Sequence, residues 1–209
     1  MLFRAIASLI NFIMRGAVFL AIAVLGGFGS AWVMIHSGSQ LTAVTSGPWV
    51  TWTAAGRMDA DPYTRAHTVR LGLLPLNSTL ALTYQAQNDA DGQRIHSSCV
   101  YSVDLSAIDA EWWSVAVFDG RGNLIRNKAN RYAFNSSTVL RDSDGSTRVV
   151  LARDARPGNW LPTGGAGRLT LALSVQDPKW VSTALNSTGA GGDAGRGHAL
   201  PVIQTISCR

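Results

Sequence analysis

A run of twenty uncharged residues, from Gly16 to Ile35, constrains this chain more than any other feature. An α-helix rises by about 1.5 Å per residue, so the run is long enough to cross a hydrocarbon core of roughly 30 Å. Arg4 and Arg15 precede the run, and the next lysine or arginine is Arg57. The positive-inside rule therefore predicts a single-pass helix, with a cytoplasmic N-terminus and an exported C-terminal domain.

A cleaved signal peptide is the alternative interpretation of this segment. Residues 29–31 (Gly-Ser-Ala) have the small side chains that a cleavage site needs. The apolar run continues beyond them through Trp32 to Ile35, and Trp32 lies where an interfacial aromatic residue belongs. We therefore favour an uncleaved signal-anchor over residues 16–36.

The first fifteen residues have the period of an amphipathic helix. Arg4, Ser8, Asn11 and Arg15 fall on one face, and apolar residues take the opposite face. The two arginines suit the anionic inner leaflet. Residues 1–15 either lie in the membrane plane or extend the spanning helix into the cytoplasm, and the sequence leaves both alternatives open.

A stripe of small residues, Ala23, Gly27 and Ala31, follows one face of the predicted spanning helix. Small residues four apart let two helix backbones approach closely in lipid. We expect this stripe to pack against a second copy of the chain or a different membrane protein.

The exported part has the pattern of an antiparallel β-protein. We expect a short flexible tether over residues 37–46 and one β-domain over residues 47–209. Alternating or apolar runs are separated by glycine and aspartate turns, as in a sandwich or barrel. The clearest runs are Leu80–Ala86, Cys99–Val103, Thr138–Leu140, Thr147–Leu151, Arg168–Val175 and Leu200–Cys208. We expect hairpin turns at Asp89–Gly92 and Asp142–Gly145 rather than calcium loops, because further oxygen ligands at fixed spacing are missing.

One short helix is predicted before the first of these strands. Asp61 can cap it, Pro62 suits its first turn and Gly72 can end it. Four apolar or aromatic residues would face the core: Tyr63, Ala66, Val69 and Leu73. Beyond the strands, residues 189–197 are glycine-rich and predict a mobile loop.

Cys99 and Cys208 are the only cysteines of the chain. Both follow the predicted spanning helix into an oxidising compartment. We therefore predict one disulfide, which ties the last strand to the strand after the Asp89–Gly92 turn.

Five motifs in order resemble the family called domain of unknown function 1214. They are Trp112-Trp113-Ser114, Phe118-Asp119, Leu124-Ile125-Arg126-Asn127, Asp144-Gly145 and Asn159-Trp160-Leu161-Pro162. The resemblance covers about Gly47 to Cys208 and implies a short membrane-anchored bacterial member with a jelly-roll-like antiparallel β-sandwich. Family members often have Leu-Arg-Leu-Tyr where this chain has Leu171-Ala172-Leu173-Ser174. The family has no established activity.

The charge pattern argues against nucleic-acid binding. The formal net charge is +5, and acidic residues interleave with the arginines instead of leaving a basic stripe. The four histidines stand far apart and the chain lacks catalytic motifs, so we expect no metal, no cofactor and no catalytic residues.

Three functions remain open. The first is a non-catalytic scaffold or accessory subunit, anchored in the bacterial inner membrane with its domain in the periplasm. The second is a glycan- or small-ligand-binding sandwich. Its candidate contacts are Trp112, Trp113, Trp160, Tyr63 and Arg65. Adjacent residues of a strand face opposite sides, so one of the paired tryptophans belongs to the core. The third is a hydrolase or lyase with a carboxylate pair at Asp109 and Glu111.

Overall fold

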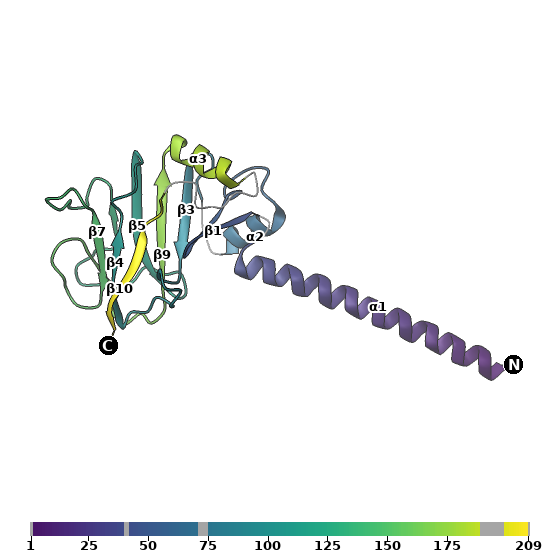
Figure 1. The fold of residues 1–209 in the computed structure, drawn as a ribbon. Coiled ribbons are helices and arrows are strands. Elements are labelled where there is room, and N and C mark those ends of the chain that lie inside the picture. The colour runs from purple at the N-terminus through teal and green to yellow at the C-terminus, as the bar shows by residue number, and fades with distance from the viewer. Residues whose placement is uncertain (1, 40–41, 71–74, 189–198, 209) are drawn as a thin grey trace.

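The computed structural model of the protein describes residues 2–39, 42–70, 75–188 and 199–208. The helices within these residues are α1 (Leu2–Ser37), α2 (Pro62–Arg70) and α3 (Pro178–Thr188). The strands are β1 (Ala43–Ser46), β2 (Trp49–Trp52), β3 (Ala81–Ala86), β4 (Cys99–Asp104), β5 (Trp112–Asp119), β6 (Ala133–Asn135), β7 (Arg148–Ala152), β8 (Trp160–Pro162), β9 (Leu169–Gln176) and β10 (Val202–Cys208). Figure 1 shows the strands gathered in one body, from which α1 projects as a straight rod.

The strands form two sheets. The larger has the order β1-β2-β3-β9-β5-β6, and the smaller has the order β10-β4-β7-β8. Neighbouring strands are antiparallel apart from β7 and β8, which run parallel. The predicted mostly-β sandwich with short helices and a preceding apolar helix is confirmed, and the sheets are mixed through that one parallel pair.

The core lies between the two sheets, with β9 central to the larger one. Leu171, Leu173 and Val175 alternate along β9 and are fully buried. They meet residues such as Val103 and Leu151 of the smaller sheet, which are equally buried. Each such side chain contributes roughly 1.5–3 kcal/mol on leaving water, so the strict alternation of β9 determines which face turns inward.

The prediction of a hairpin around Asp89–Gly92 is wrong in its pairing. β3 lies in the larger sheet and β4 in the smaller, so the chain crosses between the sheets after this turn. The turn itself forms, because the Asp89 amide donates to the Gln93 carbonyl at 2.8 Å. Its aspartate also accepts a hydrogen bond from the Thr205 hydroxyl on β10. An alternating apolar pattern predicts a strand, but it does not predict which strand will pair with it.

The run Thr138–Leu140 does not form the predicted strand. The Asn159 side chain accepts from the Leu140 amide and donates to its carbonyl, both at 2.7 Å. A single buried amide therefore takes the hydrogen bonds that a neighbouring strand would otherwise supply. The following turn closes as predicted, through the Gly145 amide and the Asp142 carbonyl.

Helix α2 begins as predicted, but it buries a different face. Asp61 caps it by accepting hydrogen bonds from the amides of Tyr63 and Thr64 at 3.0 Å each. Thr64 and His67 are the buried residues, whereas Val69 is 76% exposed. The predicted apolar face is wrong, because α2 packs on the C-terminal end of α1 rather than on the sandwich core. Gly72 and Leu73 lie outside the described residues, as do residues 189–197.

Helix α1 is continuous from Leu2 to Ser37, so residues 2–15 extend the apolar run instead of forming a separate helix. The described parts of residues 37–46 also differ from the predicted flexible tether, while residues 40–41 lie outside the described residues. Gly38 and Ser39 are buried, and β1 occupies the second half of the segment as an edge strand paired with β2. The β-domain therefore begins before residue 47.

The C-terminal strand β10 closes the smaller sheet. Cys99 and Cys208 form a disulfide between β4 and β10, at the end of their paired region. At the other end, the Trp49 indole donates to the Pro201 carbonyl at 2.8 Å. A covalent bond and a buried hydrogen bond therefore hold the two ends of this edge strand.

Candidate functional site

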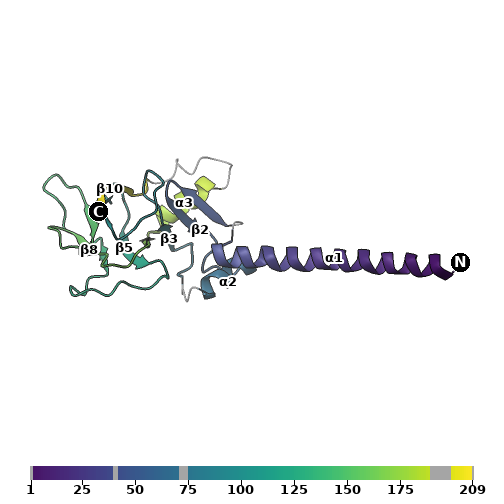
Figure 2. The same cartoon turned by 90° about the horizontal axis from the view of Figure 1, so that it is seen from below.

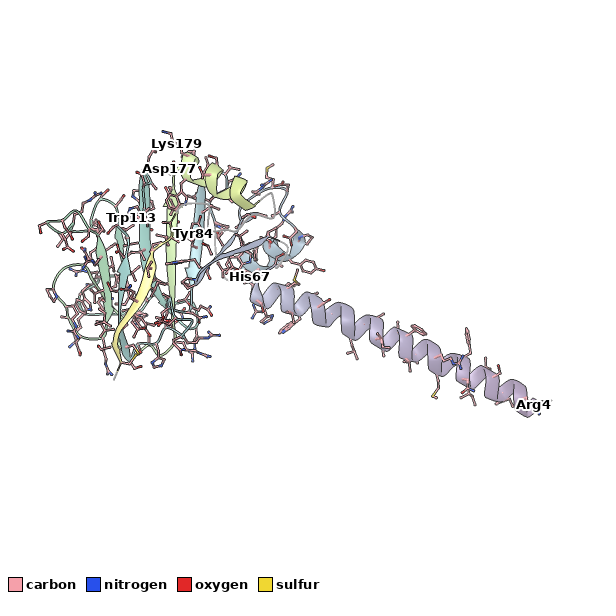
Figure 3. All side chains as sticks on the ribbon, in the orientation of Figure 1. Arg4, His67, Tyr84, Trp113, Asp177 and Lys179 are labelled. Atoms are coloured by element: carbon pink, nitrogen blue, oxygen red, sulfur yellow. A yellow bond between two sulfur atoms is a disulfide. The ribbon has the colours of Figure 1, made fainter. Side chains whose placement is uncertain are left out.

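The three candidate tryptophans do not share a surface. Trp113 is only 4% exposed and lies in the core, as its position between the sheets in Figure 3 illustrates. Trp112 precedes it on β5, is half-buried and faces away from the core, opposite Gln176. Trp160 belongs to the other sheet, where its indole donates to the Ala152 carbonyl at 3.0 Å. Trp112 alone is left on the outer face of the larger sheet.

Tyr63 and Arg65 lie on α2, apart from those tryptophans. The Arg65 guanidinium donates to the carbonyls of Ala60 and Met58, at 2.9 and 2.7 Å. It therefore fastens the preceding loop to the helix. Tyr63 is half-buried, and its amide is one of those that Asp61 caps.

The two candidate catalytic carboxylates, Asp109 and Glu111, are both exposed. A third carboxylate, Asp177, is buried at the start of α3 and accepts a hydrogen bond from the Glu111 amide at 3.1 Å. Figure 3 shows Asp177 beside Lys179. Burial acts to raise the pKa of Asp177, but the amides of Glu111, Lys179 and Trp180 outweigh it and lower the pKa. An ionised, fully bonded carboxylate of this kind fixes a helix start.

A small depression of about 90 Å³ lies beside the disulfide. It is lined by Ser97, Ser98, Cys99, Val100, Ala152, Arg153, Asp154 and Arg156. At its edge, His96 Nδ1 lies 2.8 Å from the Ser98 hydroxyl and also accepts from the Ser98 amide. That double contact is a local turn, and the volume is well below the several hundred Å³ of typical ligand pockets. Among the described residues, no group of three or more metal-ligating side chains comes together.

The most elaborate polar arrangement lies where α1 meets α2. We call it the junction and define it by Trp32, Ile35, Gly38, Ser39, Trp52, Asp61, Thr64, His67 and Arg70. Figures 1 and 2 both place α2 against the C-terminal end of α1, and Figure 3 labels His67 at the contact. His67 is 6% exposed, and its Nδ1 donates to the Ile35 carbonyl at 2.8 Å. The hydrogen bond satisfies one of the carbonyls that a helix end leaves open.

Gly38 ends α1 at a φ of +86°, the left-handed conformation that glycine adopts without strain. The indole of Trp52 lies against it, so closely that a Cβ at this position would be 2.5 Å from the ring. The same indole lies 5.2 Å from the His67 ring, measured between centroids. One β2 side chain thus packs on both helices at once.

Polar contacts complete the junction. The Ser39 hydroxyl donates to Asp61, the cap of α2. The hydroxyls of Thr42 and Thr64 are 2.9 Å apart. Burial acts to raise the pKa of Asp61, but hydrogen bonds from Thr64, Ser39 and Tyr63 outweigh it and lower the pKa. The residues that follow α1 are therefore bonded directly to the start of α2.

Sequence reasoning missed the junction. Gly38 after a long apolar run was a usable signal, because glycine commonly ends a helix. Trp52 and His67 carried no signal, since nothing in their spacing relates them to α1.

The stripe Ala23, Gly27 and Ala31 lies on the projecting part of α1. A Cβ at Gly27 would meet nothing within 4 Å, apart from the helix's own backbone. The Ser30 hydroxyl turns back to the Gly27 carbonyl at 3.0 Å. The apolar window of α1 is not buried by the described part of the chain, and α1 is long and apolar enough to cross a membrane.

Fold and junction together define a class of protein: a two-sheet sandwich packed at the end of one long apolar helix. The family model described as "Protein of unknown function (DUF1214)" matches residues 80–180. The resemblance noted in the motifs is confirmed by this match, which covers part of the sandwich. The match begins just before β3 and ends in α3, so the junction and β10 lie outside it.

One solved structure shows a similar fold, and a second is a more distant match. The VPA0106 protein from Vibrio parahaemolyticus is 21% identical with a TM-score of 0.51, over 71% of this chain and 36% of that one. An uncharacterized protein from Burkholderia cenocepacia is 17% identical with a TM-score of 0.39, over 73% of this chain and 46% of that one. The chain thus spans about a third to a half of these longer proteins. No curated protein matches it.

Proposed function

We propose that this protein is a periplasmic DUF1214 domain anchored in a bacterial inner membrane, where it holds a partner at a fixed place above the bilayer. In this proposal α1 crosses the membrane once, without cleavage, and its N-terminus stays in the cytoplasm. The domain acts by binding rather than by catalysis.

The exposure of α1 supports the anchor. Phe19 and Phe28 are each 76% exposed, and Leu25 is 73% exposed. Water around such a helix costs roughly 25 cal/mol per Å² of apolar surface, and lipid removes that cost. Arg4 and Arg15 before the uncharged run support the orientation. The disulfide agrees with an oxidising compartment on the domain side.

The junction is the observation that carries the scaffold role. A domain on a flexible tether samples many heights and orientations, whereas a scaffold must present its surface in one. Here the hydrogen bond between His67 and Ile35 and the packing of Trp52 on Gly38 join the end of α1 to α2 and to the sandwich. The position of α1 in the membrane then fixes that of the sandwich.

A topology measurement tests this proposal. A reporter enzyme that is active only in the periplasm, fused after Arg209, is expected to be active, and an N-terminal tag is expected to remain on the mature protein. A mature protein that begins at Trp32 would refute the anchor. For the scaffold, inserting a flexible ten-residue linker after Ser39 is expected to abolish crosslinks between the domain and its membrane partner. Crosslinks that survive the insertion contradict the scaffold role.

A ligand-binding sandwich is the second candidate, and the outer face of the larger sheet favours it. Trp112 lies at one end of that face, next to a row of hydroxyl residues on paired strands: Thr83, Ser174 and Ser114. The hydroxyls of Thr83 and Ser174 are 3.3 Å apart. Aromatic rings beside hydroxyl groups suit sugars. Trp112→Ala is expected to abolish binding to cell-wall glycan fragments, with Trp160→Phe as the control; equal binding by all three proteins would exclude this site.

A further inference from the structure

We propose that the C-terminal end of α2 sits in the headgroup layer of the bilayer, with Arg70 on a lipid phosphate and Val69 among the upper acyl chains. The inference rests on the proposed membrane anchor and adds to it a second, peripheral contact made by the domain itself. Its partner is the phospholipid surface that surrounds α1.

The direction of α2 carries the argument. His67 contacts the carbonyl of Ile35, and three residues further along α2 the guanidinium of Arg70 lies 5.8 Å from the ring centre of Trp32. Moving three residues toward the C-terminus of α2 therefore corresponds to moving three residues toward the N-terminus of α1. The two helices therefore run antiparallel here, and in the proposed arrangement the C-terminal end of α2 points toward the bilayer. Figures 1 and 2 show α2 beside the C-terminal end of α1.

The C-terminal end of α2 lies beside a part of α1 that still belongs to the uncharged run Gly16–Ile35. Trp32 precedes Ile35, the last residue of the uncharged stretch, by about 4.5 Å along the helix axis. If α1 spans the membrane, Trp32 lies at the interface where aromatic residues collect. Arg70 lies over its ring and hence at the same depth.

The side chains at this end suit an interface with lipid. Val69 is 76% exposed, and next to the end of α2 Trp32 and Val33 are 64% and 57% exposed. Arg70 is exposed too, and among the described residues no carboxylate lies within ion-pair distance of it. A guanidinium forms paired hydrogen bonds with phosphate, while its stem and the valine remain in the apolar layer.

The distribution of charge along α2 suits the same orientation, with its C-terminal end toward the lipid. Asp61 caps the end away from the bilayer, where Ser39 and Thr64 bond it. The basic residues His67 and Arg70 stand in the last turn, and α2 itself contains no acidic residue. The cationic end therefore faces the headgroups.

Depth-dependent fluorescence quenching tests the proposal on the full-length protein in nanodiscs of phosphatidylcholine and phosphatidylglycerol. Single cysteines carry an environment-sensitive dye, because Cys99 and Cys208 are paired and do not react. The variants are Val69→Cys for α2, Leu25→Cys for α1 and Leu140→Cys as the distant control. The Leu140 amide donates a hydrogen bond to the side chain of Asn159, which directly precedes β8. Figure 2 shows β8 on the side of the sandwich away from α1.

Nitroxide lipids are expected to quench the dye at position 69 at least twofold with a shallow label, and the dye at position 25, in the middle of the uncharged run, with a deep label. The dye at position 140 is expected to be unaffected. Quenching at position 25 without quenching at position 69 overturns the inference and leaves the anchor intact. Absence of quenching at position 25 refutes the anchor itself.

Arg70→Gln separates the phosphate contact from simple proximity. Quenching at position 69 is expected to increase with the fraction of phosphatidylglycerol in the parent and to lose that dependence in Arg70→Gln. Arg156→Gln, an exposed arginine at the distant depression, is the matched control and is expected to behave as the parent does. An unchanged lipid dependence in Arg70→Gln refutes the role assigned to Arg70.

Discussion

Asp177 follows β9, and its carboxylate is hydrogen-bonded to the start of α3 and to the residue before β5. One oxygen accepts from the Lys179 and Trp180 amides at the start of α3, and the other accepts from the Glu111 amide before β5. Trp180 then fills the core, where its indole lies 3.4 Å from the Tyr84 hydroxyl. A single residue thus sets both where α3 begins and where β5 is entered.

We predict that Asp177→Asn lowers the free energy of unfolding by about 2 kcal/mol at pH 7, the size of a lost charged cap and hydrogen bond. The pKa of Asp177 is lowered in the fold, so its stabilisation is complete above its unfolded pKa of about 4 and is lost as pH falls through the lower, folded pKa. The stability gap between parent and variant, measured by thermal unfolding in detergent, should therefore narrow below about pH 4. A constant gap from pH 7 to pH 3 would contradict this.

Gly38→Ala is predicted to loosen the junction while leaving the sandwich folded. The new Cβ would meet the Trp52 ring and would also occupy a positive φ. Distances between spin labels at Met14→Cys and Leu140→Cys should broaden, whereas the core tryptophan signal should not change. Gly47→Ala is the matched control, because Gly47 has a positive φ but open space around it. Equal distance distributions in the two variants would show that steric contact at Trp52 is irrelevant.

At the scale of elements, β10 depends on its two end contacts. It forms an edge of the smaller sheet, so only β4 pairs with it. The disulfide closes a separation of 109 residues, which in the chain-entropy model contributes on the order of 4–5 kcal/mol as an upper guide.

The double variant Cys99→Ser, Cys208→Ser is predicted to unfold at lower temperature and to exchange the amide hydrogens of β10 faster than those of β9. Central strand β9 is paired on both sides and should keep its protection. Thiol labelling of the unfolded, unreduced parent is expected to find no reactive cysteine. Two reactive thiols per chain would refute the disulfide.

On α1, Gly27→Leu is predicted to change the pattern of crosslinked species in membranes. The stripe with Ala23 and Ala31 permits close helix contact, and a leucine in its middle prevents it. Gly29→Leu is the control, because Gly29 lies two residues away on the opposite side of the helix and has equally open surroundings. If both variants crosslink as the parent does, the stripe is not an interface.

The sequence was sufficient to predict elements whose pattern is local. β9 followed from its alternation, the start of α2 followed from Asp61 and Pro62, and α1 followed from its uncharged run. Pairing was not predictable, because alternation is the same whether a strand turns back or crosses to another sheet. The prediction of a strand at Thr138–Leu140 was wrong for a related reason. Its hydrogen-bond partner is the side chain of Asn159, nineteen positions from Leu140.

The candidate site was less predictable than the fold. The paired tryptophans correctly implied one core ring, but the sequence did not say which one. The junction depends on tertiary contacts between an aromatic ring, a glycine and a histidine, and their spacing has no period. The junction was not predicted because Gly38 and Ser39 were interpreted as part of a tether. Glycine and serine after a helix are as typical of a buried turn as of a flexible linker.

At the scale of the whole molecule, the proposed scaffold role requires that α1 and the sandwich move together, so that the bilayer determines the angle of the sandwich. Helices longer than the local hydrocarbon thickness tilt to fit it. The distance from a label at Leu140→Cys to the membrane surface is therefore predicted to differ between thin and thick bilayers. A ten-residue flexible insertion after Ser39 should remove that difference, and a difference that survives it would contradict rigid coupling.

In the proposed arrangement the protein acts as a lever, with α1 as the arm that lies in lipid. A change in membrane thickness that tilts α1 would then turn the sandwich, and with it the outer face of the larger sheet. Because α2 lies on only one side of α1, that turn would have a preferred direction. Membrane thickness would thereby be converted into the orientation of the exported domain.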